Sequence, residues 1–404
     1  RCMFAAHPKN DVDSNSYRTK LTSIPRLNIN TKYVTNISHF ASHCENLTSI
    51  DTSWLNLPNV ENMISMFNSC YALQNIDMSH VVTSNKLRGI GGLVVYCINL
   101  TSIKFSSLFD TSGVAYAYTA FGHCTNLTKI DISMLDLTNI AGISGMFQYD
   151  ENLTEIKIPP NFGNNNSIHE ISGLFNNCKN LPTDQIMHII NTMNLSNTNG
   201  DLSWTFNDCH KLTNIDISHI GLVLRANMYY LFCNCIELVS VKMPNIPSNL
   251  GAYFVNTFLE CKKLISIDIP NSPNSIKVTD MDYMFYNCEL LSSSVINPIL
   301  KMCNTTDLTS ANGVFGGCKS VTSLDLSSWN IGDKLTQIAY MFRDCKKLVK
   351  VNLPAWNSTT VKRIENLFEG CEKLLSIDLS KWNIILDNTT GTQNLFLNCS
   401  SIKI

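Results

Sequence analysis

A phenylalanine followed three residues later by a cysteine recurs about every 27 residues along this chain. The pattern reads FNSC at Phe67–Cys70, FRDC at Phe342–Cys345 and FLNC at Phe396–Cys399. A fixed period of this length is typical of a solenoid, in which one coil cannot fold alone and neighbouring coils bury each other. The row has gaps of 26 to 31 residues, with Asp150 where one cysteine is missing, and consists of Cys44, Cys70, Cys97, Cys124, Cys178, Cys209, Cys235, Cys261, Cys288, Cys318, Cys345, Cys371 and Cys399.

Each coil also carries an aliphatic residue three positions after the row cysteine, and most coils carry another after six. The segment from Leu73 reads LQNIDMS, which fits the L-x-x-L-x-L strand of a leucine-rich repeat. Its alternation points Ile76 and Met78 inward and Asp77 outward. The segment before the cysteine, such as Met281–Phe285, suits a helical or 3₁₀ turn. The sequence therefore predicts an α/β leucine-rich-repeat solenoid of about 14 coils, with a parallel sheet on one face and short helical or 3₁₀ turns on the other.

The unbroken repeat predicts one elongated domain, although a globular chain of 404 residues would usually divide into roughly two or three. We expect a single solenoid over residues 35–404, preceded at 1–34 by a degenerate coil or flank in which Leu21–Leu27 reads LTSIPRL. A solenoid normally has a polar cap at each end. Neither end offers one, so we expect that the chain is a processed or truncated part of a longer protein, or that its open ends dock on a neighbour by self-association.

Two coils are longer than the rest and replace the strand with a helical pattern, near 182–196 and 292–305. We expect the carboxylate of Asp184 to cap the first of these helices. The helical coils are interpreted either as tolerated insertions that interrupt the sheet or as docking features for a partner or a second copy. Their apolar residues at helical spacing are Ile186, Ile189, Ile190 and Met193 in the first coil and Val295, Ile299, Leu300 and Cys303 in the second.

Sixteen cysteines admit three interpretations, as buried thiols, disulfides or metal ligands. Disulfide frameworks have irregular spacings in short chains, whereas this row occupies one structural position repeatedly. Zinc requires four convergent ligands, and the histidines show no period that matches the row. We therefore favour buried free thiols, which act as small apolar groups, over sporadic disulfides and over a metal site. Cys2, Cys233 and Cys303 lie off the row and are the first candidates to pair or react.

The polar residue between the last two strand aliphatics forms a row on the outward side of the predicted sheet. Its charge alternates from coil to coil in two stretches, and opposite charges on neighbouring strands are mildly favourable. One interpretation is a solvent-exposed charge ladder, and the other is a surface that binds a partner. No further polar residues converge on any pair, so the row predicts no catalytic carboxylates. The candidate partner surface consists of Asp77, Lys104, Asp131, Lys157, Asp216, Lys242 and Asp268.

Charge and hydropathy argue against two classes of partner. The chain has 30 basic and 32 acidic residues without a basic block, so it lacks the electrostatic pattern of a nucleic-acid-binding protein. No stretch approaches the roughly 20 apolar residues that cross a bilayer, and we expect no membrane-spanning segment.

The coils MFRDCKKLVKVNLPAWN at 341–357 and LFEGCEKLLSIDLSKWN at 367–383 resemble the repeat of the BspA-like leucine-rich repeat proteins. More narrowly, the motif M-F-x-x-C-x-x-L-x-x-I-D-L-S-x-W-N is similar to the roughly 26-residue surface-protein repeat of mycoplasmas, listeriae, lactobacilli and some protists. The resemblance covers about residues 35–404. It implies a secreted or surface-anchored protein that adheres to host molecules or other cells, and it supplies no catalytic residues.

These residues and this resemblance predict a non-enzymatic protein, secreted or at the cell surface, that recognises a protein or glycan partner through a face of its solenoid. The alternative is a structural protein, either a subunit of an extracellular filament or a component of a virus or phage particle. Neither interpretation requires a cofactor, a metal or catalytic residues.

Overall fold

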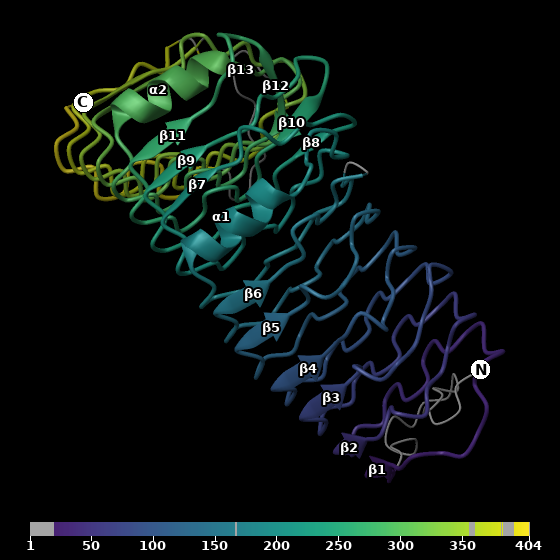
Figure 1. Cartoon of the computed structure of the whole chain (residues 1–404). Coiled ribbons are helices and arrows are strands. Elements are labelled where there is room, and N and C mark those ends of the chain that lie inside the picture. Colours follow the sequence, from purple (N-terminus) through teal and green to yellow (C-terminus); the bar gives the residue numbers. More distant parts are fainter. Residues whose placement is uncertain (1–19, 166–167, 355–359, 381, 383–391, 404) are drawn as a thin grey trace. The chain divides into compact units, whose positions relative to one another are not determined.

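Each of two units folds into a parallel-strand solenoid (Figure 1). Together the described residues form about 13 coils, close to the predicted number of about 14. The computed structural model describes residues 20–165, 168–354, 360–380, 382 and 392–403. Its residues group into two compact units, unit 1 at 1–198 and unit 2 at 199–404. The division into a flank at 1–34 and one solenoid at 35–404 stays a prediction.

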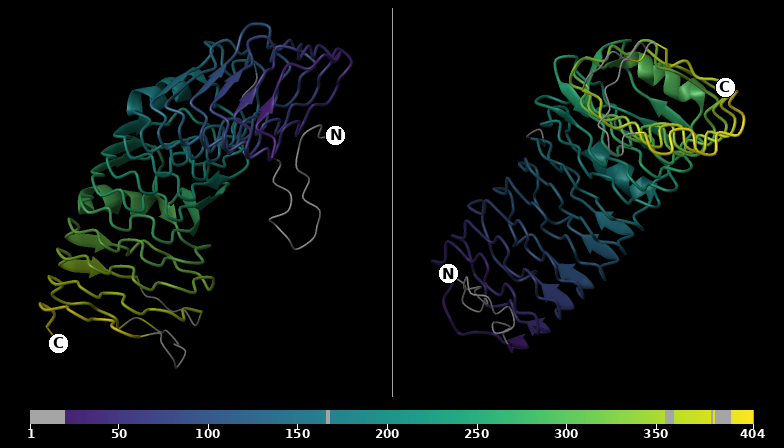
Figure 2. Two further views of the ribbon diagram at one scale, coloured as in Figure 1. Left: turned by 90° about the horizontal axis from the view of Figure 1, so that it is seen from below. Right: turned by 180° about the vertical axis from the view of Figure 1, so that it is seen from behind.

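The strands of unit 1 follow one another coil by coil, and each has only two or three residues (Figure 2). Parallel pairing joins β1 to β2, β3 to β4 and β5 to β6. In the second pair Ile76 lies beside Ile103 and Asp77 beside Lys104, so equivalent positions of successive coils are aligned. The elements are β1 (Ser23–Ile24), β2 (Ser49–Ile50), β3 (Asn75–Asp77), β4 (Ser102–Lys104), β5 (Lys129–Asp131), β6 (Glu155–Lys157) and α1 (Thr183–Thr192).

Unit 2 has sheets on two different sides of its coils (Figure 1). The first side carries the I-x-L segments, as a sheet of order β11-β9-β7 and the pair β14-β15. The second side, here called the second ladder, carries a sheet of order β13-β12-β10-β8. The elements are β7 (Asn214–Asp216), β8 (Ala226–Asn227), β9 (Ser240–Lys242), β10 (Gly251–Tyr253), β11 (Ser266–Asp268), β12 (Ile276–Asp280), α2 (Ser293–Met302), β13 (Cys303–Asn304), β14 (Ser323–Asp325) and β15 (Lys350–Asn352).

Tight turns, in place of the predicted helical or 3₁₀ turn, precede the row cysteine. Along this turn, backbone amides donate alternately to a carbonyl of the next coil and to one of their own coil. Phe67 N donates to Leu93 O of the next coil at 2.9 Å, whereas Cys70 N donates to Phe67 O of its own coil at 3.3 Å. This path needs a left-handed backbone twice in each coil, with φ of 56° at Ser65 and 59° at Ser69. Because the coil-to-coil bonds hold these positions, residues other than glycine occupy them in most coils.

Helix α1 buries Ile186, Ile189 and Ile190 on one face. The predicted cap by Asp184 is wrong. The residue before the helix is Pro182, no side chain caps its first amides, and Asp184 lies inside the first turn. There its charge still favours the positive end of the helix dipole.

Helix α2 buries Ile296, Ile299 and Leu300, and Cys303 is buried directly after it. The choice of Val295 as an inward residue is corrected, because its side chain is only partly covered. The inward positions i, i+3, i+4 and i+7 start from Ile296, which is the same spacing that α1 uses.

The row phenylalanines form stacked columns in the interior of both units. In unit 1 the rings of Phe121, Phe147 and Phe175 lie 6.0 and 6.2 Å apart. In unit 2 the column runs from Phe206 to Phe396, with centroids 5.1 to 6.2 Å apart. These separations suit offset stacking, and each buried ring adds about 1.5–3 kcal/mol of hydrophobic stabilisation.

The row cysteines are buried thiols that bond one coil to the next. Cys345 Sγ donates to Phe315 O at 3.1 Å and Cys371 Sγ to Phe342 O at 3.1 Å, and most coils repeat this contact. All 15 cysteines of the described residues are buried and take part in no disulfide bond, whereas Cys2 lies outside these residues. Burial also raises the pKa of Cys233 and of Cys303 to about 12, which suppresses the reactive thiolate at both off-row positions.

Asp150 occupies the position that a row cysteine holds in the other coils. Its Oδ1 accepts a hydrogen bond from Cys124 N at 2.7 Å, and its buried Oδ2 has no partner. Burial raises the pKa of Asp150 well above its ordinary value, because it disfavours the charged form of the carboxyl group. In the unfolded chain the same carboxyl would ionise near pH 3.9, so keeping it uncharged opposes folding at neutral pH.

We expect Asp150→Cys to stabilise the fold at pH 7 and to have little effect at pH 3.5. A raised folded pKa costs nothing below the unfolded value, and the cost grows as pH rises above it, so the gain from the substitution should be present at pH 7 and nearly absent at pH 3.5. Thermal unfolding followed by circular dichroism measures both conditions. Asp333→Asn, at an exposed carboxylate outside any helix or strand, is the control. Equal shifts in Tm at the two pH values would contradict this explanation.

Candidate functional site

The seven residues of the predicted partner surface lie on the outward side of the strands. Unit 1 contributes Asp77, Lys104, Asp131 and Lys157 from β3 to β6, and unit 2 contributes Asp216, Lys242 and Asp268 from β7, β9 and β11. Parallel register sets opposite charges beside each other, as in Asp131 beside Lys157. The structure thus places all seven side chains on the strand face, and their role in binding stays a prediction.

Most row aspartates are held by a serine two residues later, whereas Asp268 is followed there by Pro270. Asp131 Oδ1 accepts from Ser133 N at 3.1 Å and from Ser133 Oγ at 2.6 Å. Asp216 Oδ1 makes the same two contacts with Ser218, at 3.1 and 2.6 Å. This local turn ends the strand and leaves only Oδ2 to face a neighbouring strand. One oxygen of each of these carboxylates is therefore committed to the fold.

The second oxygen meets the lysine of the next coil. Lys242 Nζ lies 3.0 Å from Asp216 Oδ2, and Lys157 Nζ lies 3.8 Å from Asp131 Oδ2. The hydrogen bond from Ser218 and, to a smaller extent, the one from Lys242 lower the pKa of Asp216 to about 2. The same hydrogen bond to Asp216 raises the pKa of Lys242. Both groups remain charged across the physiological range.

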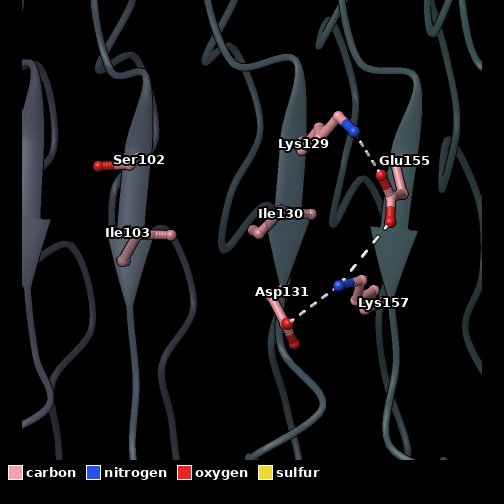
Figure 3. A pocket seen from close by; sticks show the side chains of 7 residues that line it. All are labelled: Ser102, Ile103, Lys129, Ile130, Asp131, Glu155 and Lys157. Atoms are coloured by element: carbon pink, nitrogen blue, oxygen red, sulfur yellow. Dashed lines mark ion pairs between the residues drawn. The ribbon is translucent and has the colours of Figure 1, made fainter.

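A shallow hollow of about 330 Å³ lies on this face in unit 1, over β4, β5 and β6 (Figure 3). A quartet of alternating charges spans β5 and β6. Lys129 Nζ contacts Glu155 at 2.8 Å, and Lys157 Nζ lies 3.9 Å from Glu155 and 3.8 Å from Asp131. The hydrogen bond from Lys129 lowers the pKa of Glu155. The hollow is lined by Ser102, Ile103, Lys129, Ile130, Asp131, Glu155 and Lys157.

Sequence reasoning missed Lys129 and Glu155, which complete this quartet. Both stand two residues before a predicted member, and strand residues at i and i+2 share a face. The two-residue period of a strand therefore indicated both residues, whereas the predicted partner surface took only one residue from each strand. Conversely, Lys104 and Asp77 belong to the same face but take no part in the quartet.

Two family models match the chain, each over more than half of its length. The model described as "Mycoplasma protein of unknown function, DUF285" matches residues 16–88, 252–382 and 313–404, and "BspA type Leucine rich repeat region (6 copies)" matches 96–198 and 195–306. The chain belongs to the BspA-like leucine-rich repeat proteins. Members of this family are generally binding scaffolds without catalysis. A search of curated proteins found no significant match.

Solved structures of bacterial leucine-rich repeat proteins are similar to this BspA-like chain at low identity. One from Bacteroides ovatus ATCC 8483 is 16% identical, with a TM-score of 0.39 over 91% of this chain and 84% of that chain. One from Eubacterium ventriosum ATCC 27560 is 16% identical, with 0.41 over 89% and 85%. A leucine rich cell surface protein from Faecalibacterium prausnitzii A2-165 is 17% identical, with 0.28 over 93% and 81%. These similarities carry no argument about function.

In the part of the chain that the structure describes, no three or more histidine, cysteine, aspartate or glutamate side chains gather in a way that would hold a metal ion. Neither helix in that part has the length and apolar character to cross a bilayer.

We expect Ser218→Ala to raise the pKa of Asp216 from about 2 toward its ordinary value of 3.8, because the serine hydroxyl makes the largest contribution to the lowered value. Carbon-detected NMR titration of the carboxyl group measures this change. Lys242→Ala should raise the pKa less, since its contribution is smaller. If Lys242→Ala has the larger effect, the serine turn does not control this carboxylate.

Proposed function

We propose that this BspA-like chain is a non-enzymatic recognition or adhesion protein of the cell surface or extracellular space, and that it binds a protein partner through the strand face of unit 1. The observation that carries the proposal is the charge quartet of Lys129, Asp131, Glu155 and Lys157 beside an open hollow. A protein surface with complementary charges fits it better than a small apolar ligand, because the hollow is shallow and its rim is charged.

Because the side chains of the quartet are exposed, they can exchange their present ion pairs for ion pairs with a partner on binding. The side chains of Lys129 and Lys157 are 69% and 59% exposed. Ion pairs this exposed add little to stability, so a partner can replace them at little cost to the fold. The same charges would steer the partner and make association weaker at high salt.

Buried thiols are compatible with a location outside the cell. An oxidising compartment attacks the thiolate of an accessible cysteine. The described cysteines are buried, and burial raises the pKa of several of them above its ordinary value. The alternative of a filament or particle subunit stays a prediction, which sedimentation at rising concentration would check.

Binding of the purified chain to a panel of immobilised extracellular matrix, serum and mucosal proteins tests the proposal by surface plasmon resonance. We expect at least one partner, and Lys129→Glu combined with Lys157→Glu should weaken its binding about tenfold or more, because two attractive charges become repulsive. Lys242→Glu in unit 2 is the matched control. Binding that the double variant leaves unchanged would exclude the strand face of unit 1 as the site.

A further inference from the structure

A second group of polar and aromatic side chains lies in unit 2, away from the strand face. It follows the second ladder, where parallel bridges join Asp280 to Ser310, Ser310 to Gln337 and Gln337 to Arg363. Its members come from four successive coils and occupy neighbouring positions in each. We call it the second-ladder cluster; it consists of Asp282, Tyr283, Asn312, Gln337, Tyr340, Arg363 and Glu365.

Hydrogen bonds connect the polar members without a break. Asp282 Oδ1 accepts from Ser310 Oγ and from Asn312 N, both at 2.6 Å. Asn312 Nδ2 donates to Asp282 Oδ2 at 3.2 Å and to Gln337 Oε1 at 3.1 Å. Arg363 Nη1 donates to the same Gln337 oxygen at 3.4 Å. The planar carboxylate, amide and guanidinium groups are therefore held in fixed positions across four coils.

Two tyrosine rings border this network. Tyr283 leans across the next coil, since a Cβ at Gly313 would lie 2.5 Å from its Cε1. Tyr340 follows two coils later at the same position, and the guanidinium of Arg343 lies 5.9 Å from its ring centroid. Both rings are only half-buried, so each keeps part of its surface open to solvent.

One acceptor of the cluster lacks a partner. Glu365 is 6% exposed, and Arg363 Nε donates to its Oε1 at 2.7 Å. Its Oε2 is buried without a hydrogen bond. Ala339 stands between Asn312 and Glu365 in the stack of coils, and its methyl group supplies no donor. Leaving a buried carboxylate oxygen unpaired is unfavourable, so this end of the network is the least satisfied part of the cluster.

We propose that the second-ladder cluster binds a neutral oligosaccharide. Carboxylates and amides accept hydrogen bonds from sugar hydroxyls, guanidinium and amide groups donate to them, and the apolar faces of sugar rings pack on tyrosine. The cluster contains two carboxylates and one arginine, so its charge disfavours an anionic oligosaccharide. The strand face of unit 1 differs in both respects, since no aromatic ring lines its hollow and lysines form half of its quartet. The proposal rests on another surface of another unit and stands independently of the proposed function.

Tyr340→Asn is the variant that tests the cluster with least disturbance. Tyr340 has φ of 60°, and Asn366 and Asn394 occupy the same position of the next two coils with φ of 54°. Asparagine tolerates this left-handed conformation, so the backbone should be preserved while the ring is removed. An unchanged Tm would verify that the variant folds.

Isothermal titration calorimetry of the full chain with cellohexaose, chitohexaose, mannohexaose and a heparin hexasaccharide measures binding. We expect at least one neutral hexasaccharide to bind, and Tyr340→Asn and Gln337→Ala each to weaken it about tenfold. Tyr230→Asn, at the same coil position but outside the cluster, and Lys157→Glu on the strand face should leave it unchanged. The proposal fails if no neutral sugar binds, if only heparin binds, or if Tyr340→Asn binds as tightly as the parent.

Discussion

The hydrogen bond from a buried thiol to the carbonyl of the preceding coil is the contact on which the regularity of this solenoid depends. A carbonyl such as Phe315 O already accepts Cys318 N, and Cys345 Sγ approaches it from the next coil. The thiol is small enough to lie beside the phenylalanine column and still brings a weak donor. An aliphatic side chain would fill the space without the bond. A carboxyl group fills it less well, because burial disfavours its charged form, as at Asp150.

Because the interior repeats from coil to coil, the residues that distinguish this protein lie on its surface. The strand face and the second ladder differ in how freely their residues vary. On the strand face the aspartates serve the turn through Ser79, Ser133 and Ser218, so the same local contact recurs in many coils. On the second ladder Asn227 and Asp280 make this contact, whereas Ser310, Gln337 and Arg363 occupy the equivalent position in later coils. There, tyrosine, amide and charged residues replace one another from coil to coil, which is how a repeat protein acquires a local site without altering its core.

Much of the fold was predictable because it follows from periodicity. The 27-residue spacing predicted the stack, and the I-x-L alternation predicted that Ile76 would be buried and Asp77 exposed. Periodicity could not choose between Val295 and Ile296, which are both aliphatic; only a comparison of the two helical coils aligns Ile296 with Ile186.

Other features had no signal in the sequence. The left-handed turn positions hold residues as different as Ser65, Trp204 and Tyr340, so composition does not mark them. Conversely, the second-ladder cluster joins positions that share no repeating residue type, and its members were recognisable only once the coils were stacked. Pro182 likewise took the place that a capping carboxylate was expected to hold.

Thiol burial also bears on how long such a molecule lasts once it is folded. Nearly every coil contains a cysteine that is protected only while its neighbours stay closed. In an oxidising medium, a coil that opens briefly exposes a thiol, and oxidation would prevent the coil from packing again. Loss of the protein would then be governed by the rate of the first opening, and its lifetime would be a kinetic property set by the least stable coil.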